Sequence, residues 1–197
     1  MTPLAMSVVI LWLVVVALVF VVLALTRQLG VLHERIAPAG ALMINRGPAV
    51  GGRVEPLEVI DLDGRDLRIG EPRTDGKSTL ILFVSPTCPV CKALLPVVRS
   101  SREQERGWLD IVLASDGDPA EHQRFVREHG LLGFPYVISA ALGLSYQVSR
   151  LPFAALLDGS GLLRARGLVN SREHLESLFE AKRLGVASLQ EYFSSRA

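Results

Sequence analysis

Residues 85–92 read SPTCPVCK, and the interpretation of the whole chain starts from this stretch. It contains the only two cysteines of the chain, Cys88 and Cys91, with two residues between them. The apolar run at residues 79–84 precedes it and predicts a strand buried on both faces, and a helical pattern follows from Cys88 to about Arg102. A disulfide between cysteines at this spacing can close across the first turn of a helix. The pattern therefore predicts a redox-active pair.

The order of the two cysteines assigns them different roles. Thiolate is the nucleophilic form of cysteine, and amide groups at a helix N-terminus stabilise an anion there, which favours Cys88 as the attacking residue. We expect Cys91 to be more buried and to resolve the mixed disulfide that Cys88 forms with a partner. This exchange needs no cofactor other than the redox-active disulfide.

Metal or haem binding is the alternative reading of a C-x-x-C pair. A structural zinc site needs four ligands, but the sequence has neither a second C-x-x-C nor an H-x-x-x-H. The four histidines are scattered: His33, His122, His129 and His174. Haem attachment would require histidine where Lys92 stands. We expect no metal site and no haem.

Charge and length limit the other function classes. The chain has 197 residues, which suits one domain and an additional segment. Its 21 lysines and arginines balance 20 aspartates and glutamates, so nucleic acid is not an expected partner. Two cysteines so close in sequence also argue against a fold held together by disulfides.

The uncharged segment from Leu4 to Leu25 predicts one uncleaved transmembrane helix. Such a helix would rise about 33 Å, enough for a hydrocarbon core of about 30 Å. A secretory signal peptide has a shorter apolar region, about 7–15 residues, and small residues at its cleavage site, whereas this run leads into Thr26 and Arg27.

The residues leave the orientation of this helix open. The arginines at positions 27, 35 and 46 follow the span and favour a cytoplasmic domain by the positive-inside rule. A lone redox pair fits better outside the cytosol, where disulfides persist.

The remaining pattern predicts an α/β fold with a mixed sheet. Strands at 57–60 and 66–69 flank Asp63-Gly64 and form a hairpin, and a buried strand covers 111–114. A helix begins at Asp118, with Pro119 in its first turn and Glu121 completing a capping box, and it ends at Gly130. A second hairpin joins 154–157 to 162–166, and a last helix is capped by Asn170 and Glu173.

With these elements, residues 50–185 resemble the thioredoxin superfamily. Lys92 after the second cysteine, Pro96 five residues beyond Cys91, and Leu151-Pro152 before a strand all match positions of the family pattern. The resemblance implies a cis-proline loop in which Leu151 and Pro152 face the active site and bind a substrate strand. It also implies that Lys92 and Pro96 support the active site.

The spacer and two departures narrow this resemblance. Pro89 and Val90, which we also expect to support the active site, form a spacer whose proline resembles that of oxidising periplasmic disulfide proteins. Thioredoxins have a buried acid six residues before the first cysteine, where this chain has Leu82. Cytochrome c-maturation reductases have glutamate after the cis-proline, where this chain has Phe153. Both departures weaken a general-reductant or haem-chaperone role.

Over its whole length the chain is similar to the MauD family of methylamine utilisation. The features that carry this likeness are the hydrophobic anchor running into residues 26–38, TRQLGVLHERIAP, and the Cys-Pro-Val-Cys motif. The family implies a role in maturing methylamine dehydrogenase, whose small subunit is dense in disulfides and carries a quinone made from tryptophans. The small subunit is thus the expected partner, together with the membrane. The family also implies a single pass through the inner membrane and a periplasmic domain.

The expected architecture is a thioredoxin-like α/β fold with an N-terminal β-hairpin extension, preceded by one transmembrane helix. We divide the chain into an anchor at 1–26, a juxtamembrane linker at 27–49, the thioredoxin-like domain at 50–185 and a tail at 186–197. The alternative functions are a general membrane-bound disulfide oxidoreductase, a non-catalytic chaperone of the subunit, or, more weakly, delivery of haem or copper. The sequence does not decide whether the protein acts as an oxidant, an isomerase or a reductant, because sequence does not give a reduction potential.

Overall fold

The computed structural model describes residues 7–8, 10–22 and 47–184, and the chain divides into two compact units, 1–44 and 45–197. In the first unit the described residues are helical and their side chains are exposed. Among all described residues, no helix has both the length and the apolar character needed to cross a membrane.

Several predicted segments lie wholly or partly outside the described residues. They are the ends of the expected span Leu4–Leu25, most of the linker at 27–49, and the tail at 186–197. The described structure therefore concerns chiefly the predicted thioredoxin-like domain.

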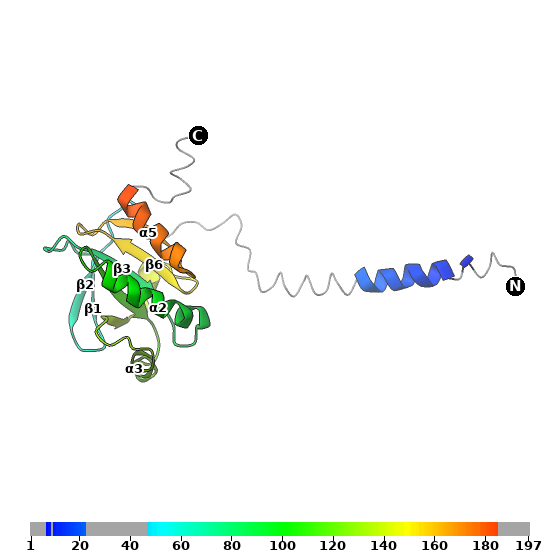
Figure 1. Cartoon of the computed structure of the whole chain (residues 1–197), viewed down its shortest axis with the longest axis horizontal. Helices are drawn as coiled ribbons and strands as arrows, with labels where there is room; N and C mark the ends of the chain where they lie inside the picture. The colour runs from blue at the N-terminus through cyan, green and yellow to red at the C-terminus, as the bar shows by residue number, and fades with distance from the viewer. Residues whose placement is uncertain (1–6, 9, 23–46, 185–197) are drawn as a thin grey trace. The chain divides into compact units, whose positions relative to one another are not determined.

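A five-stranded mixed sheet in the order β5-β4-β3-β6-β7 forms the centre of this domain (Figure 1). Its strands are β3 (Ser78–Phe83), β4 (Leu109–Ser115), β5 (Tyr136–Ile138), β6 (Phe153–Leu157) and β7 (Leu163–Leu168). The strands β3, β4 and β5 are parallel, whereas β6 pairs antiparallel with both β3 and β7. The expectation of an α/β fold with a mixed sheet is confirmed.

Helices cover the two faces of the sheet unequally. They are α2 (Pro89–Gln104), α3 (Pro119–Glu128), α4 (Ala140–Ser145) and α5 (Arg172–Leu184). Side chains alternate along a strand, so Leu80 and Leu82 of β3 join the apolar cluster beneath α2, α3 and α5. Ile81 and Phe83 join the cluster on the other face, beneath α4 and the N-terminal hairpin. All of β3 is consequently buried, as its continuous apolar run predicts.

The predicted N-terminal hairpin is present as β1 (Leu57–Ile60) and β2 (Asp66–Ile69). Gly64 takes the left-handed conformation that its turn needs, with a φ of 79°. The carboxylate of Asp61 accepts hydrogen bonds from the backbone amides of Asp63 and Arg65 at 3.0 and 2.8 Å. A β-bridge between Asp61 and Val137 then connects the hairpin to β5.

Two predicted helix caps differ from the structure. Asp118 does cap α3, but its side chain accepts from Ala120 at 3.1 Å, while the amide of Glu121 donates to the Asp118 carbonyl. The capping box with Glu121 is therefore wrong, because the amide it needs is already bound within the first turn. The helix α5 begins at Arg172, so Ser171 precedes it in place of the predicted Asn170. Its hydroxyl accepts from the amide of His174 at 3.4 Å.

Candidate active site

Cys88 is the N-cap residue of α2 and forms a disulfide with Cys91, one turn into the helix. Their Cα atoms are 5.2 Å apart. Cys88 keeps an extended backbone, with φ −87° and ψ 111°, and its Sγ accepts a hydrogen bond from the backbone N–H of Cys91 at 3.1 Å. The first turn of α2 therefore directs an amide donor at the Cys88 sulfur, as expected for a site that stabilises a thiolate.

The two sulfurs differ in exposure. Cys91 is completely buried, in the apolar cluster that also contains Leu82, Leu94 and Leu95. Cys88 is half-buried and packs against the edge of that cluster. An incoming thiolate can therefore reach the disulfide only through Cys88.

The segment between β3 and α2 fixes the position of Cys88. The amide of Cys88 donates to the carbonyl of Ser85 at 3.1 Å, which closes a tight turn. The hydroxyl of Ser85 also contacts the Thr87 hydroxyl at 2.9 Å and accepts from the Thr87 amide at 3.3 Å. Pro89 follows in the first helical position, where its missing N–H leaves no hydrogen bond unmade.

The remaining predicted support residues lie on the outer side of α2. Val90 and Lys92 are exposed next to the cysteine pair. Pro96 lies inside the helix, also exposed, and α2 continues past it to Gln104. The structure thus places Val90 and Lys92 beside the disulfide and Pro96 further along the helix.

The Leu151–Pro152 peptide bond is cis, as predicted. Phe153, the first residue of β6, pairs with Phe83, the last residue of β3. The cis-proline loop therefore lies at the carboxyl end of β3, the end from which the chain continues to Cys88. Pro152 is buried and its carbonyl accepts from Val169 at 3.0 Å, whereas Leu151 is exposed.

A groove of about 350 Å³ opens at this end of the sheet. It is lined by the carboxyl ends of β3 and β4, by α4 and by the segment leading to Leu151. Of the predicted site residues, only Leu151 lines it. The lining residues that the sequence analysis missed include Ser115, Asp116, Leu144 and Arg150.

The helix α4 forms one wall of this groove and was not predicted. A signal for it exists in the sequence, because Ser139 is its N-cap and accepts from the amide of Leu142 at 3.2 Å. Leu144 on this helix is 76% exposed, which gives the wall an apolar contact surface.

A buried histidine stabilises the loop after β4, which contributes Asp116 to the lining of the groove. The Nε2 of His122 lies 2.8 Å from the carbonyl oxygen of Asp116, and its Nδ1 lies 2.8 Å from the Tyr136 hydroxyl. A carbonyl can only accept, so Nε2 carries a proton and donates to Asp116. Burial raises the pKa of Tyr136 to about 12, so this phenol stays protonated and available as a donor.

The interior beneath the disulfide is apolar. The first turn of α2 has no acidic residue, and Leu82 is fully buried at the position where thioredoxins carry an acid. Among the described residues, no three potential ligands of the histidine, cysteine, aspartate or glutamate type come together as a metal site. Exchange without a metal or other cofactor stays a prediction.

Comparison with solved structures identifies the fold. StoA of Bacillus subtilis matches with a TM-score of 0.55 and 21% identity, covering 67% of this chain and 99% of that one. The exposed lipoprotein thioredoxin Etrx1 of Streptococcus pneumoniae matches with a TM-score of 0.55 and 18% identity, covering 64% and 99%. At these identities the likeness shows the fold alone. A closed C-x-x-C disulfide at the start of α2 in this fold defines a thioredoxin-like thiol–disulfide oxidoreductase.

Sequence comparison narrows the class to one family, although no family model matches the chain. The methylamine utilization protein MauD of Paracoccus denitrificans is 46% identical over 188 residues, 95% of this chain and 93% of that protein. MauD of Paracoccus versutus is 43% identical over 196 residues, covering 100% and 98%. The chain belongs to the MauD family.

Proposed function

We propose that this chain is a membrane-anchored, periplasmic oxidoreductase that forms or corrects disulfides in the small subunit of methylamine dehydrogenase. The observation that carries the proposal is the disulfide closed between Cys88 and Cys91 in a member of the MauD family. The relatives are named for methylamine utilization, which supports a substrate within that system. The family resemblance implies a small subunit dense in disulfides, which makes it the substrate we propose within that system.

The proposed reaction is two successive thiol–disulfide exchanges. A substrate thiolate attacks the Sγ of Cys88, the bond to Cys91 breaks, and the Cys91 sulfur takes the electron pair and a proton. A second substrate thiolate then attacks the substrate sulfur of the mixed disulfide and releases Cys88 as a thiolate. The substrate gains one disulfide and the cysteine pair gains two electrons. An oxidant of the disulfide or quinone class must then reoxidise the pair.

The geometry of the site supports this division of roles. The amide of Cys91, 3.1 Å from the Cys88 sulfur, favours the Cys88 thiolate and makes it a good leaving group. The Cys91 sulfur lies among apolar side chains, where burial disfavours a charge, so it rests as a thiol once reduced. The same arrangement lets Cys91 release a wrongly paired substrate, which is the step an isomerase needs.

We assign substrate binding to the cis-proline loop and the groove beside it. Leu151 and Pro152 lie at the carboxyl end of β3, where backbone of the loop can pair with an extended substrate strand. Exposed Val90 on α2 and exposed Leu144 on α4 offer apolar contacts. An unfolded subunit, with its apolar side chains exposed, fits such a surface.

Membrane anchoring is proposed from the sequence at the N-terminus. The segment from Leu4 to Leu25 has no charged residue and the length of one span. We place the domain in the periplasm because disulfides persist there, although the arginines after the span favour the opposite orientation. Protease added to spheroplasts should digest the domain. Complete protection of the domain until the membrane is opened would reverse this topology.

The decisive experiment is to replace Cys91 by serine and search for a trapped partner. The variant has no Cys88–Cys91 disulfide, so its adduct forms when the Cys88 thiolate attacks a substrate disulfide and one substrate sulfur leaves as a thiolate. Without the Cys91 thiol, that adduct cannot be released by exchange within the pair. We expect a reducible adduct on a non-reducing gel of the Cys91→Ser strain, and mass spectrometry should identify it as the methylamine dehydrogenase small subunit. The matched control is the double variant Cys88→Ser, Cys91→Ser, which should form no adduct.

Other outcomes separate the competing functions. A broad range of unrelated envelope proteins on Cys88 would indicate a general disulfide oxidoreductase and contradict a dedicated partner. A double variant that still supports normal levels of the small subunit would indicate a chaperone whose cysteines are dispensable. A lower level of the small subunit alone is expected on deletion, because a chain that lacks its disulfides is unfolded and open to proteolysis.

A further inference from the structure

The amino ends of β3 and β4 carry a second groove, at the end of the sheet opposite the cysteine pair. Its volume is about 440 Å³, and it is lined by the last turns of α2, the first residues of β4 and the loop between α3 and β5. With 16 residues, α2 is about 24 Å long, so this groove and Cys88 lie at opposite ends of the helix. The groove therefore cannot belong to the redox site.

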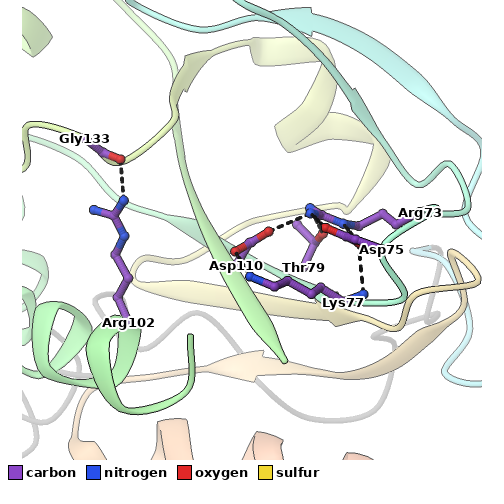
Figure 2. A network of polar contacts seen from close by, with 7 residues as sticks. All are labelled: Arg73, Asp75, Lys77, Thr79, Arg102, Asp110 and Gly133. Atoms are coloured by element: carbon purple, nitrogen blue, oxygen red, sulfur yellow. Dashed lines mark hydrogen bonds and ion pairs between the residues drawn. The ribbon is translucent and has the colours of Figure 1, made fainter. Parts of the chain in front are cut away.

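The groove has an excess of positive charge. Its lining contains the cations Lys77, Arg99, Arg102 and Arg106 and the anions Glu103 and Asp110. Asp110 is already neutralised, because Arg73 lies 2.6 Å and Lys77 3.4 Å from its carboxylate oxygens (Figure 2). Three guanidinium groups then face a single remaining carboxylate, that of Glu103.

Two of the three arginines, Arg99 and Arg102, are held in place without being neutralised. Arg102 donates to the carbonyl of Gly133 at 2.6 Å, away from the ion pairs around Asp110, as Figure 2 shows, and it stacks 4.2 Å above the Phe134 ring. Arg99 donates to the carbonyl of His129 at 3.2 Å. Within the described part of the chain, neither these two nor Arg106 forms an ion pair. A fixed guanidinium loses little side-chain entropy when it binds a carboxylate.

One arginine in the last turn of α2 is explained by the helix dipole, but three around a concave surface are not. We propose that this basic groove docks an acidic segment of a polypeptide partner. The arginines extend over roughly 10 Å, too far for one small anion, whereas alternate side chains of an extended strand repeat about every 7 Å. Leu132, 72% exposed at the groove, offers an apolar contact that suits a polypeptide.

This docking site is independent of which protein the cysteine pair oxidises. A partner bound at the amino end of the sheet leaves the Cys88 face free. A single partner long enough to span the domain could occupy both.

The test measures binding of a fluorescein-labelled octapeptide of alternating glutamate and serine to the full chain, by fluorescence anisotropy. The groove variant combines Arg99→Gln with Arg106→Glu. The matched control combines Arg127→Gln with Arg124→Glu on α3, two exposed arginines outside the groove, so the net charge changes equally. We expect the groove variant to bind at least about tenfold more weakly and the control to stay within about twofold.

Further arms keep the proposal open to refutation. Arg106 is exposed, and Arg106→Gln alone breaks no hydrogen bond or ion pair within the described residues, so the variant should fold normally and weaken binding by about threefold. The octapeptide with lysine in place of glutamate should not bind. Added salt should weaken the binding of the acidic octapeptide. Equal losses in the groove and control variants, no binding of the acidic peptide, or binding only to phosphatidylglycerol vesicles would overturn it. The disulfide exchange rate should not change in any variant, which separates this test from that of the proposed function.

Discussion

The two ends of the parallel strands use electrostatics in different ways. At the carboxyl end, the cysteine pair is stabilised by a backbone amide of α2 and by apolar burial, with no acidic residue in the first helical turn. At the amino end, side-chain charges dominate, with Arg73 and Lys77 paired to Asp110. Backbone dipoles are fixed by the fold, whereas a charged surface side chain can be replaced by substitution without changing the fold. We infer that the redox chemistry is insensitive to surface charge substitutions, while the amino end can change its partners without affecting it.

The largest expected effect is on the reactivity of the two thiols at the carboxyl end. In the reduced protein, Cys88 should react with iodoacetamide at least about 100-fold faster than Cys91, because it alone combines exposure with amide stabilisation. Its rate should reach half-maximum below about pH 8.5, the value for free cysteine. Single variants, Cys91→Ser and Cys88→Ser, allow each thiol to be measured alone. Faster labelling of Cys91 would contradict the assignment.

A charge placed beneath the cysteine pair should destabilise the fold. Leu82 is fully buried in the same cluster as Cys91, so Leu82→Asp should lower the free energy of unfolding by about 3 kcal/mol or more near neutral pH. Burial raises the folded-state pKa of the new carboxyl above its unfolded value of about 3.9, so the native state binds more protons. The loss of unfolding free energy in Leu82→Asp should therefore grow as pH rises from about 4 and shrink in acid.

The control for this substitution is Leu82→Asn, which has a similar shape and no charge. Urea unfolding at several pH values should show a loss for Leu82→Asn that does not vary with pH. If the two variants responded to pH in the same way, the buried charge of Leu82→Asp would not be the cause of its loss of stability.

The β6–β7 turn, at the amino end of β3, depends on one carboxylate. Asp158 accepts from the amides of Ser160 and Leu162 at 2.9 and 3.0 Å and pairs with Arg164 at 2.6 Å. Asp158→Asn should cost about 1–2 kcal/mol, because its amide would face the Arg164 donor. The equivalent change at Asp63, exposed in the other hairpin, should cost less than about 0.5 kcal/mol.

The pH dependence of the Asp158 effect follows from its pKa. Burial raises this pKa, but the hydrogen bonds from Ser160, Leu162 and Arg164 together lower it below the usual value. A lowered folded-state pKa contributes stability above about pH 3.9 that is lost as pH falls further. The melting temperatures of the wild type and of Asp158→Asn should therefore converge in acid. A difference that stays constant with pH would contradict the ionised Asp158 carboxylate as the cause.

Local sequence patterns were sufficient for the part of the fold that carries the chemistry. The apolar run of β3 followed by the cysteine pair predicts a buried strand leading into a helix, and the structure has both. The cis bond at Pro152 came from family resemblance, since no local pattern distinguishes it from an ordinary turn proline.

The elements that sequence reasoning missed are short and stabilised by distant contacts. The strand β5 has three residues and exists because Tyr136 pairs with Leu113 of β4, far away in sequence. The helix α4 has six residues, too few to show a helical period. The groove near the cysteine pair is lined by α4, and the basic groove is lined by the loop that precedes β5. The carbonyl of Gly133 that positions Arg102 is a further example, because only the folded chain brings it to α2.

The smallest effect is expected from the ion pairs around Arg73. Arg73 contacts Asp75 and Asp110, but its side chain is 32% exposed and that of Asp110 is 40% exposed. Loss of the Arg73–Asp110 pair in Arg73→Gln should lower the free energy of unfolding by less than about 1 kcal/mol, and this loss should diminish in high salt.

The effect of Arg73→Gln should also depend on pH. The hydrogen bond from Arg73 holds the pKa of Asp75 well below its usual range, so the stability that this bond contributes is present above about pH 3.9 and lost in acid. Chemical denaturation at low and high salt checks the stability, and the thiol exchange rate should match that of the wild type. A change in that rate would show that charge at the amino end reaches the cysteine pair, and the contrast between the two ends would fail.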